Sequence, residues 1–158
     1  MDGLNNNYRR VRRITIVNKS IILSDKDKQE LAKYAESEKP YESCAILVGN
    51  ETDENWTVKE LVLTENTAKS EVTFTISPDK EFEVDQKAKK SNMEIICIFH
   101  SHPKSIALPS STDKEFMGLN GDIPWIIFSG LTTDFKAFIL KEDVEEIQIK
   151  IMERHFFQ

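Results

Sequence analysis

The sequence predicts an α/β (α+β) protein in which helices flank a mixed β-sheet. A chain of 158 residues is long enough to form one domain with its own core. Apolar segments with the two-residue period of strands alternate with three segments that begin with helix-capping residues. No internal repeat or linker interrupts this pattern. We therefore expect one domain over residues 11–152, between a disordered arm at 1–10 and a tail at 153–158.

The first third of the chain predicts a strand, a helix and a second strand. Residues 11–23 are rich in β-branched side chains, which favours a strand. Ser24 can cap a helix by accepting a backbone N–H from its first turn, and Pro40 ends that helix. Residues 42–48 predict the second strand, and the Gly49–Asn50 pair predicts the turn that follows it.

The middle of the chain predicts two more strands and a second helix. Residues 56–64 have the period of a strand, but the apolar side chains change face midway, so we expect a β-bulge or a twist there. After a polar connector at 65–70, residues 72–76 alternate as a half-buried strand. The Ser77–Pro78 pair predicts a helix start, with the end near residues 91–92.

The last third of the chain begins with an apolar strand at 93–102. A loop at 104–108 then leads to a helix that starts at about Ser110 and ends near Gly118. Further strand patterns follow at 125–128, 135–140 and 147–151. The last of these is either a one-sided edge strand or the continuation of an antiparallel hairpin.

Composition excludes several classes of protein. The net charge of −6 argues against nucleic-acid binding, which requires a basic surface. No apolar run approaches the 18 residues of a membrane span, so we expect no membrane association. Cys44 and Cys97 lie in apolar segments and predict buried thiols in a reducing compartment, which favours the cytoplasm. The basic cluster at 9–13 lacks the apolar segment of an export signal, so we interpret it as a solvated arm.

Two of the three histidines stand at the end of the strand at 93–102. His100 and His102 are separated by one residue, so their side chains can point to the same face. Pro103 ends the strand directly after them, and Asp113 follows in the first turn of the predicted helix. Two imidazoles and a carboxylate are the ligands of a catalytic zinc that keeps its fourth position for water.

This arrangement resembles the H-S-H-P…S-x-x-D motif of the JAMM (MPN-plus, JAB1/MPN/Mov34) metalloproteases. His100-Ser101-His102-Pro103, Ser110 and Asp113 carry the resemblance. The family also has an upstream glutamate, which Glu42 matches within Pro40–Gly49, although Ala45 stands where the family usually has glycine. The resemblance covers about residues 14–152. It implies a mostly antiparallel JAB1/MPN-like, cytidine-deaminase-like sheet flanked by helices.

The resemblance also implies a role for each site residue. His100, His102 and Asp113 would hold one Zn²⁺, and Glu42 would act as general base and then general acid. Taken alone, Glu42 would be an exposed carboxylate at a strand edge. Ser110 would stabilise the oxyanion. A serine at this place is most often the helix N-cap, but Ser111 could cap instead and leave Ser110 free.

Members of the family hydrolyse the bond after the C-terminal glycines of ubiquitin or of ubiquitin-like proteins. The chain is close to the minimal domain, so it resembles a stand-alone archaeal or bacterial member. We expect an isopeptidase or peptidase, as a monomer or a homodimer, that acts on a ubiquitin-like modifier or a sulfur-carrier β-grasp protein with a Gly-Gly C-terminus. The segments at 65–70 and 104–108 are the expected specificity elements.

Two alternatives stay open at this point. One is a catalytically inactive MPN-type scaffold or binding module, although such relatives typically lose ligands that this chain keeps. The other is a zinc hydrolase of short peptides or small molecules. Zinc deaminases have a related architecture, but this chain lacks their Pro-Cys-x-x-Cys signature.

Overall fold

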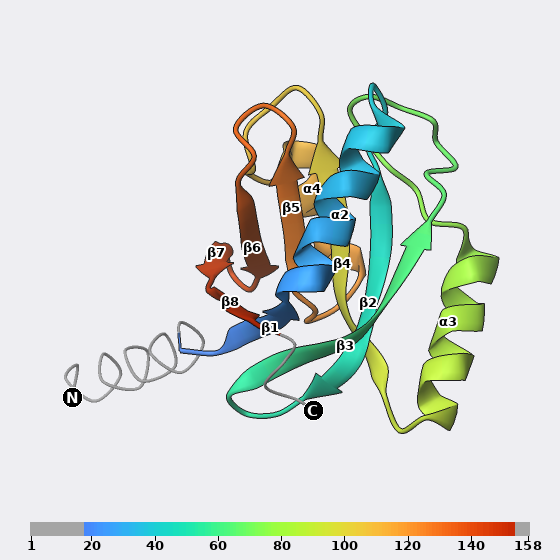
Figure 1. Ribbon diagram of the computed structural model, residues 1–158, viewed down its shortest axis with the longest axis vertical. Helices are drawn as coiled ribbons and strands as arrows, with labels where there is room; N and C mark the ends of the chain where they lie inside the picture. The colour runs from blue at the N-terminus through green and yellow to red at the C-terminus, as the bar shows by residue number, and fades with distance from the viewer. Residues whose placement is uncertain (1–17, 154–158) are drawn as a thin grey trace.

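The fold is taken from a computed structural model, which describes residues 18–153. The predictions for the arm at 1–10, for the start of the first strand at 11–17 and for the tail from residue 154 lie outside the described residues. Within the described part, the chain forms a curved sheet with helices on both faces (Figure 1).

Between residues 18 and 153, eight strands form one sheet in the order β7-β6-β5-β4-β2-β3-β1-β8. The strands are β1 (Ser20–Ser24), β2 (Cys44–Glu51), β3 (Asn55–Thr64), β4 (Glu94–His102), β5 (Trp125–Ser129), β6 (Phe135–Leu140), β7 (Val144–Ile147) and β8 (Ile149–Met152). The helices are α2 (Asp25–Glu38), α3 (Pro78–Lys90) and α4 (Ser111–Leu119). Pairs β1–β3, β1–β8 and β4–β5 are parallel and the other four are antiparallel, which confirms the predicted mixed, mostly antiparallel sheet.

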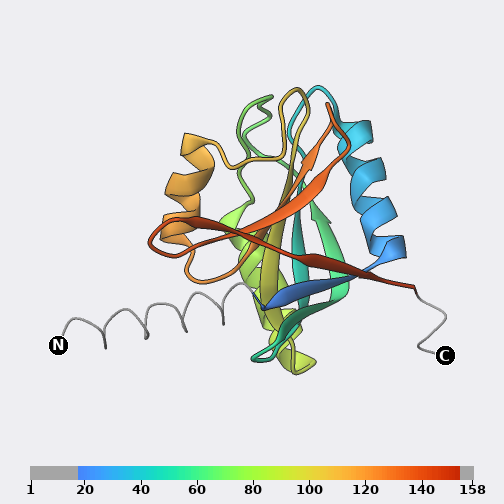
Figure 2. The same cartoon turned by 90° about the vertical axis from the view of Figure 1, so that its left-hand side faces the viewer.

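The two ends of the sheet are joined by one extended segment. β7 and β8 are separated only by Gln148, yet β7 pairs with β6 and β8 pairs with β1. The segment crosses the front of the molecule in Figure 2 and joins the two ends of the strand order. The sequence left an edge strand and a continued hairpin as alternatives. The structure shows a hairpin for β7 only, because the segment then leaves β6 and pairs with β1.

Each face of the sheet has its own apolar core. Leu31 and Ala35 of α2 pack on one face, in a cluster that includes Cys97 and Phe99 of β4. The other face carries a cluster that includes Ile98 of β4 and is covered by α3 and α4. Since side chains alternate along a strand, His100 and His102 share the face of Ile98. Cys97 therefore points away from them, into the cluster on the other face.

The predicted helix starts are confirmed by their caps. Ser24 Oγ accepts the N–H of Asp27 at 3.0 Å, and Ser77 Oγ accepts that of Lys80 at 3.5 Å. α3 ends at Lys90 and has Ser91 as its C-cap, close to the predicted end. None of the helices described between residues 18 and 153 is long and apolar enough to cross a membrane.

The predicted turn at Gly49–Asn50 is wrong, because β2 continues to Glu51. The glycine is required by close packing inside the sheet, since a Cβ there would lie 1.9 Å from the Thr57 carbonyl oxygen. At the same place the pairing with β3 shifts by one residue, so Lys59 is extra on its strand. This shift is the β-bulge that the change of face predicted.

The predicted strand at 72–76 is also wrong. Residues 65–77 form an irregular loop between β3 and α3. Phe74 is buried and Val72 is 77% exposed, so the alternation reflects one anchoring side chain in a loop. The backbone groups of Thr73 and Thr75 bond to the side chain of Asn66. These bonds replace the sheet ladder that the alternation predicted.

Candidate metal centre

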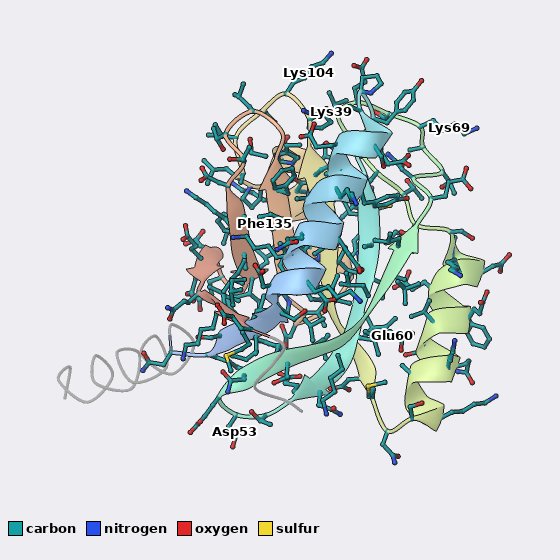
Figure 3. The ribbon with its side chains drawn as sticks, viewed as in Figure 1. Lys39, Asp53, Glu60, Lys69, Lys104 and Phe135 are labelled. Atoms are coloured by element: carbon teal, nitrogen blue, oxygen red, sulfur yellow. The ribbon has the colours of Figure 1, made fainter. Side chains whose placement is uncertain are left out.

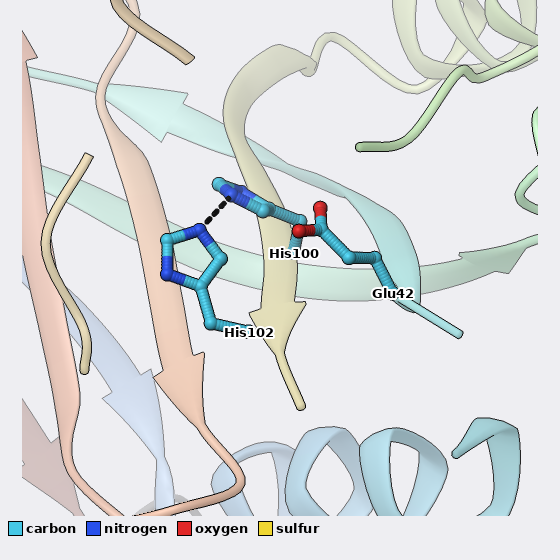
Figure 4. A group of neighbouring side chains, drawn as sticks. All are labelled: Glu42, His100 and His102. Carbon is cyan, nitrogen blue, oxygen red and sulfur yellow. Dashed lines mark hydrogen bonds between the residues drawn. The ribbon is translucent and has the colours of Figure 1, made fainter. Parts of the chain in front are cut away.

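His100 and His102 are the buried end of β4. Side-chain alternation places both imidazoles on the face covered by α3 and α4, and they are 0% and 5% exposed. Their Nε2 atoms lie 3.1 Å apart (Figure 4). Beyond the strand, Lys39, Lys69 and Lys104 project at the end of the molecule where the connecting loops gather (Figure 3).

Asp113 completes a group of three converging side chains. It stands in the first turn of α4 and is buried. Its Oδ1 lies 3.2 Å from His100 Nε2, and its Oδ2 lies 3.1 Å from His102 Nε2. The structure thus brings together the three ligand residues predicted from the sequence.

The spacing of these atoms suits a bound cation. A four-coordinate metal ion with bonds of about 2.0–2.1 Å would hold its ligand atoms about 3.3–3.4 Å apart, close to the spacing of His100, His102 and Asp113. His102 Nδ1 lies 2.9 Å from the Ile106 carbonyl oxygen, which can only accept, so Nδ1 carries a hydrogen. In the neutral ring, Nε2 then presents a lone pair to the group, as a metal ligand must.

Glu42 faces the same group from the segment that leads into β2. It lies two residues before β2 and is 3% exposed. One of its ligand atoms lies within 4.8 Å of a ring nitrogen of each histidine. Its Oε1 has no hydrogen-bond partner among residues 18–153. A buried carboxylate oxygen without a partner is costly, so this atom is suited to a water or a substrate group that the chain itself does not supply.

The protonation states of the group suit cation binding. Complete burial lowers the pKa of His100, which favours its neutral form. Burial alone would raise the pKa of Asp113, but its hydrogen bonds with both histidines outweigh that effect and hold the pKa far below its usual range. Burial would lower the pKa of His102, but the bonds to Asp113 and the Ile106 carbonyl outweigh it and the pKa is raised. The raised pKa favours a proton on His102 Nε2, opposite Asp113 Oδ2, when no metal ion is bound.

The pKa of Glu42 is shifted in the opposite direction to that of Asp113. Burial raises the pKa of its carboxyl to about 8, while the charge of His102 opposes this and that of Asp113 adds to it. A carboxyl whose pKa lies near neutral pH can both accept and release a proton. The site therefore combines a group of side chains suited to cation binding with a carboxyl suited to proton transfer.

Comparison with known proteins identifies the family. Residues 24–141, most of the chain, match the family described as prokaryotic homologues of the JAB domain. The chain belongs to this prokaryotic JAB family. The resemblance predicted from the histidine motif is thereby confirmed.

Two other JAB-like matches agree with this assignment. The desampylase of Pyrococcus furiosus is 30% identical over 111 residues, which are 70% of this chain and 75% of that protein. The solution structure of protein DSY2949 from Desulfitobacterium hafniense matches with a TM-score of 0.77 at 25% identity. That match covers 85% of this chain and 94% of the other, so the two proteins share one fold over most of their length.

Ser110, the remaining JAB motif residue, is the N-cap of α4. Its Oγ accepts the N–H of Asp113 at 3.0 Å, and its own N–H donates to Asp113 Oδ2 at 2.9 Å. The interpretation in which Ser111 caps the helix is therefore wrong. The cap uses the acceptor side of the Ser110 hydroxyl, so its hydrogen can still be donated to a substrate.

Some residues that shape the JAB site were not singled out from the sequence. Ser101 was named only as part of the motif, and its hydroxyl oxygen accepts the main-chain N–H of Ser43 at 2.8 Å. Asn66 and Gly130 were not identified at all, because a lone asparagine or glycine in a polar loop gives no specific signal. Gly130 donates its N–H to the His102 carbonyl at 2.8 Å.

Proposed function

We propose that this chain is a zinc-dependent isopeptidase or peptidase that hydrolyses the amide bond after the C-terminal glycines of a ubiquitin-like modifier or a sulfur-carrier protein. One observation carries the proposal. Three metal-ligating side chains converge within 3.1–3.2 Å of one another, beside a buried glutamate oxygen that has no partner in the described chain. The relative from Pyrococcus furiosus bears the name desampylase, for an enzyme that removes a modifier, and supports this class of substrate.

The ligand residues suit zinc in particular. His100, His102 and Asp113 would hold the ion, and two nitrogens with one oxygen are a common ligand set of catalytic zinc. When bound, zinc lowers the pKa of a coordinated water to about 7 and polarises the carbonyl of the scissile amide. Because Asp113 is ionised and His100 is neutral, these two residues already have the protonation states that coordination requires.

Glu42 and Ser110 would supply the remaining chemistry. Glu42 would take the proton of the attacking water on a carboxylate oxygen and deliver it to the leaving amine nitrogen. Its Oε1 has no partner in residues 18–153, so it is available for this transfer. Ser110 would donate its hydroxyl hydrogen to the developing oxyanion while its oxygen caps α4.

We infer that a substrate would reach the site between two loops. Ser70 of the 65–77 loop accepts the N–H of Glu42, and Ile106 of the 103–110 loop contacts His102. The neighbours of these residues, Glu71 and Lys104, form an ion pair of 2.8 Å that joins the loops. An extended C-terminal tail would enter beside this pair, so the two loops are the proposed specificity elements. The two buried free cysteines fit a reducing compartment such as the cytoplasm.

The test is cleavage of a defined substrate. Zinc-loaded protein should release a reporter fused behind the Gly-Gly end of a host ubiquitin-like protein, with the cut after the last glycine by mass spectrometry. Glu42→Gln should keep stoichiometric zinc and lose turnover, whereas His102→Ala should lose the zinc. Cleavage of short peptides without cleavage of any folded fusion would point to a peptidase of small substrates. Absence of zinc binding by the wild-type protein would refute the enzyme.

A further inference from the structure

We propose that Asn66 is a positioning residue that holds Glu42 in place for proton transfer. The inference rests on the proposed function, because it assigns a residue to the support of its general base. Asn66 is the second residue after β3, is only 8% exposed and lies outside the JAB motif described above.

The side-chain amide of Asn66 has partners on both sides. Nδ2 donates to the carbonyl of Glu42 at 2.9 Å and to that of Thr73 at 3.0 Å. Oδ1 accepts the backbone N–H of Ala68 at 3.1 Å and that of Thr75 at 3.0 Å. Since carbonyls only accept and backbone N–H groups only donate, the orientation of the amide is fixed by these four partners. Full use of a buried amide is a strong local constraint.

These bonds connect the loop at 65–77 to the main chain of Glu42. Its carbonyl accepts from Asn66, and its N–H donates to the Ser70 carbonyl at 2.9 Å. Both main-chain groups of Glu42 therefore bond to one loop, which Asn66 holds together from inside. Within residues 18–153 the Glu42 carboxylate has an unpartnered Oε1, so the orientation of this side chain depends on its backbone.

The residues that would hold the metal are supported differently. His100 and His102 lie on β4, and Asp113 lies in the first turn of α4. The connection from the loop to these ligands is the ring of Phe74, which stacks on His100 with centroids 4.6 Å apart. A specific loss of Glu42 positioning should thus lower turnover and spare zinc affinity. General loosening of the loop should instead weaken zinc binding through Phe74.

The deciding variant is Asn66→Asp, which keeps the size of the side chain but places an acceptor against two carbonyls. We expect the zinc-loaded variant to lose about 10- to 100-fold in kcat on the Gly-Gly fusion substrate, since a displacement of about 1 Å can cost that much. The zinc Kd and the KM should each change by less than about threefold. An unchanged kcat, or an equal loss of zinc affinity, would overturn the assignment.

A matched control uses the other end of β2. Asn50 Nδ2 donates to the Asn92 carbonyl at 2.9 Å, which is the same chemistry away from the site. Asn50→Asp should leave kcat unchanged. If Asn66→Asp does not fold, Asn66→Ala removes the same donors without adding a charge and is held to the same criteria.

A measurement on the unmodified protein tests the contact without any activity. In the metal-free wild type, the side-chain amide protons of Asn66 and the backbone N–H of Glu42 should exchange slowly with solvent by NMR. Exchange at the rate of a free asparagine would overturn the inference. This readout also separates the two proposals: protected protons in a wild type that cleaves no substrate would refute the enzyme and leave the contact standing.

Discussion

Ser110 and Asp113 hold each other at the start of α4 by two reciprocal hydrogen bonds of 3.0 and 2.9 Å. The capping box satisfies backbone donors of the first turn. It also fixes Asp113 Oδ2, which lies 3.1 Å from His102 Nε2. Helix capping and the candidate metal site therefore share one carboxylate.

The capping box predicts a cost for Ser110→Ala that Ser111→Ala does not share. Loss of the N-cap should lower the free energy of unfolding by about 1 kcal/mol, and the less constrained Asp113 should bind zinc more weakly. Urea unfolding and a zinc titration measure the two effects. Ser111→Ala should change neither, because Ser111 lies in the first turn and does not cap it. Equal effects of the two variants would contradict the assigned cap.

Glu42 predicts a pH dependence of the stability of the metal-free protein. Its folded pKa is about 8 and its unfolded value is about 4.5, so the folded state holds a proton in this range that the unfolded state releases. The stabilisation is fully present below about pH 4.5 and is lost as the pH rises through 8. Relative to Glu42→Gln, the wild type should lose roughly 3–5 kcal/mol of unfolding free energy over this window.

Urea unfolding with chelator at pH 5.5, 7 and 8.5 measures this difference. The other titrating groups are common to both proteins, so the difference reports on Glu42. Glu142→Gln, at an exposed carboxylate, is the control and should run parallel to the wild type. Parallel curves for Glu42→Gln as well would show that Glu42 titrates as an ordinary surface glutamate.

Ser101→Ala should destabilise the fold and misplace Glu42. The change removes the acceptor of the buried Ser43 N–H and the 2.9 Å bond between the two serine hydroxyls. A buried donor without a partner costs about 1–3 kcal/mol, to be measured by urea unfolding. Ser37→Ala removes an exposed hydroxyl bond of 2.8 Å to Tyr34 and should cost less than about 0.5 kcal/mol. A Ser101 variant as stable as this control would contradict the role.

Substitution by alanine should have opposite effects on stability at Gly130 and at Gly118. A Cβ at Gly130 would lie 2.7 Å from the Pro103 carbonyl oxygen, just after His102. Gly130→Ala should therefore cost about 1–3 kcal/mol and weaken zinc binding. A Cβ at Gly118 would meet only Leu140 Cδ2 at 3.6 Å, within a helix, so Gly118→Ala should stabilise by up to about 1 kcal/mol. Thermal unfolding and zinc titration compare the two, and a harmless Gly130→Ala would refute the close contact.

The helix starts and the faces of the strand residues could be predicted from the sequence, because they depend on neighbouring residues. A serine directly before a helical segment can cap the helix with its hydroxyl oxygen. Ser24 and Ser77 do so, and the starts of α2 and α3 could therefore be predicted from the sequence. The period of two placed His100 and His102 on one face and Cys97 on the other. The same alternation, broken midway through residues 56–64, indicated the irregularity that the structure shows as a bulge in β3.

The tertiary structure decided the features that depend on distant partners. Residues 72–76 have the alternation of a strand, but the amide of Asn66 takes the bonds that a neighbouring strand would have provided. Gly49 resembles a turn residue and is instead required by the approach of Thr57. The segment at 144–152 joins the two ends of the sheet, because its first part pairs with β6 and its second part pairs with β1. Alternation and capping act over a few residues and can be read along the chain, whereas these contacts exist only after strands far apart in the sequence have met.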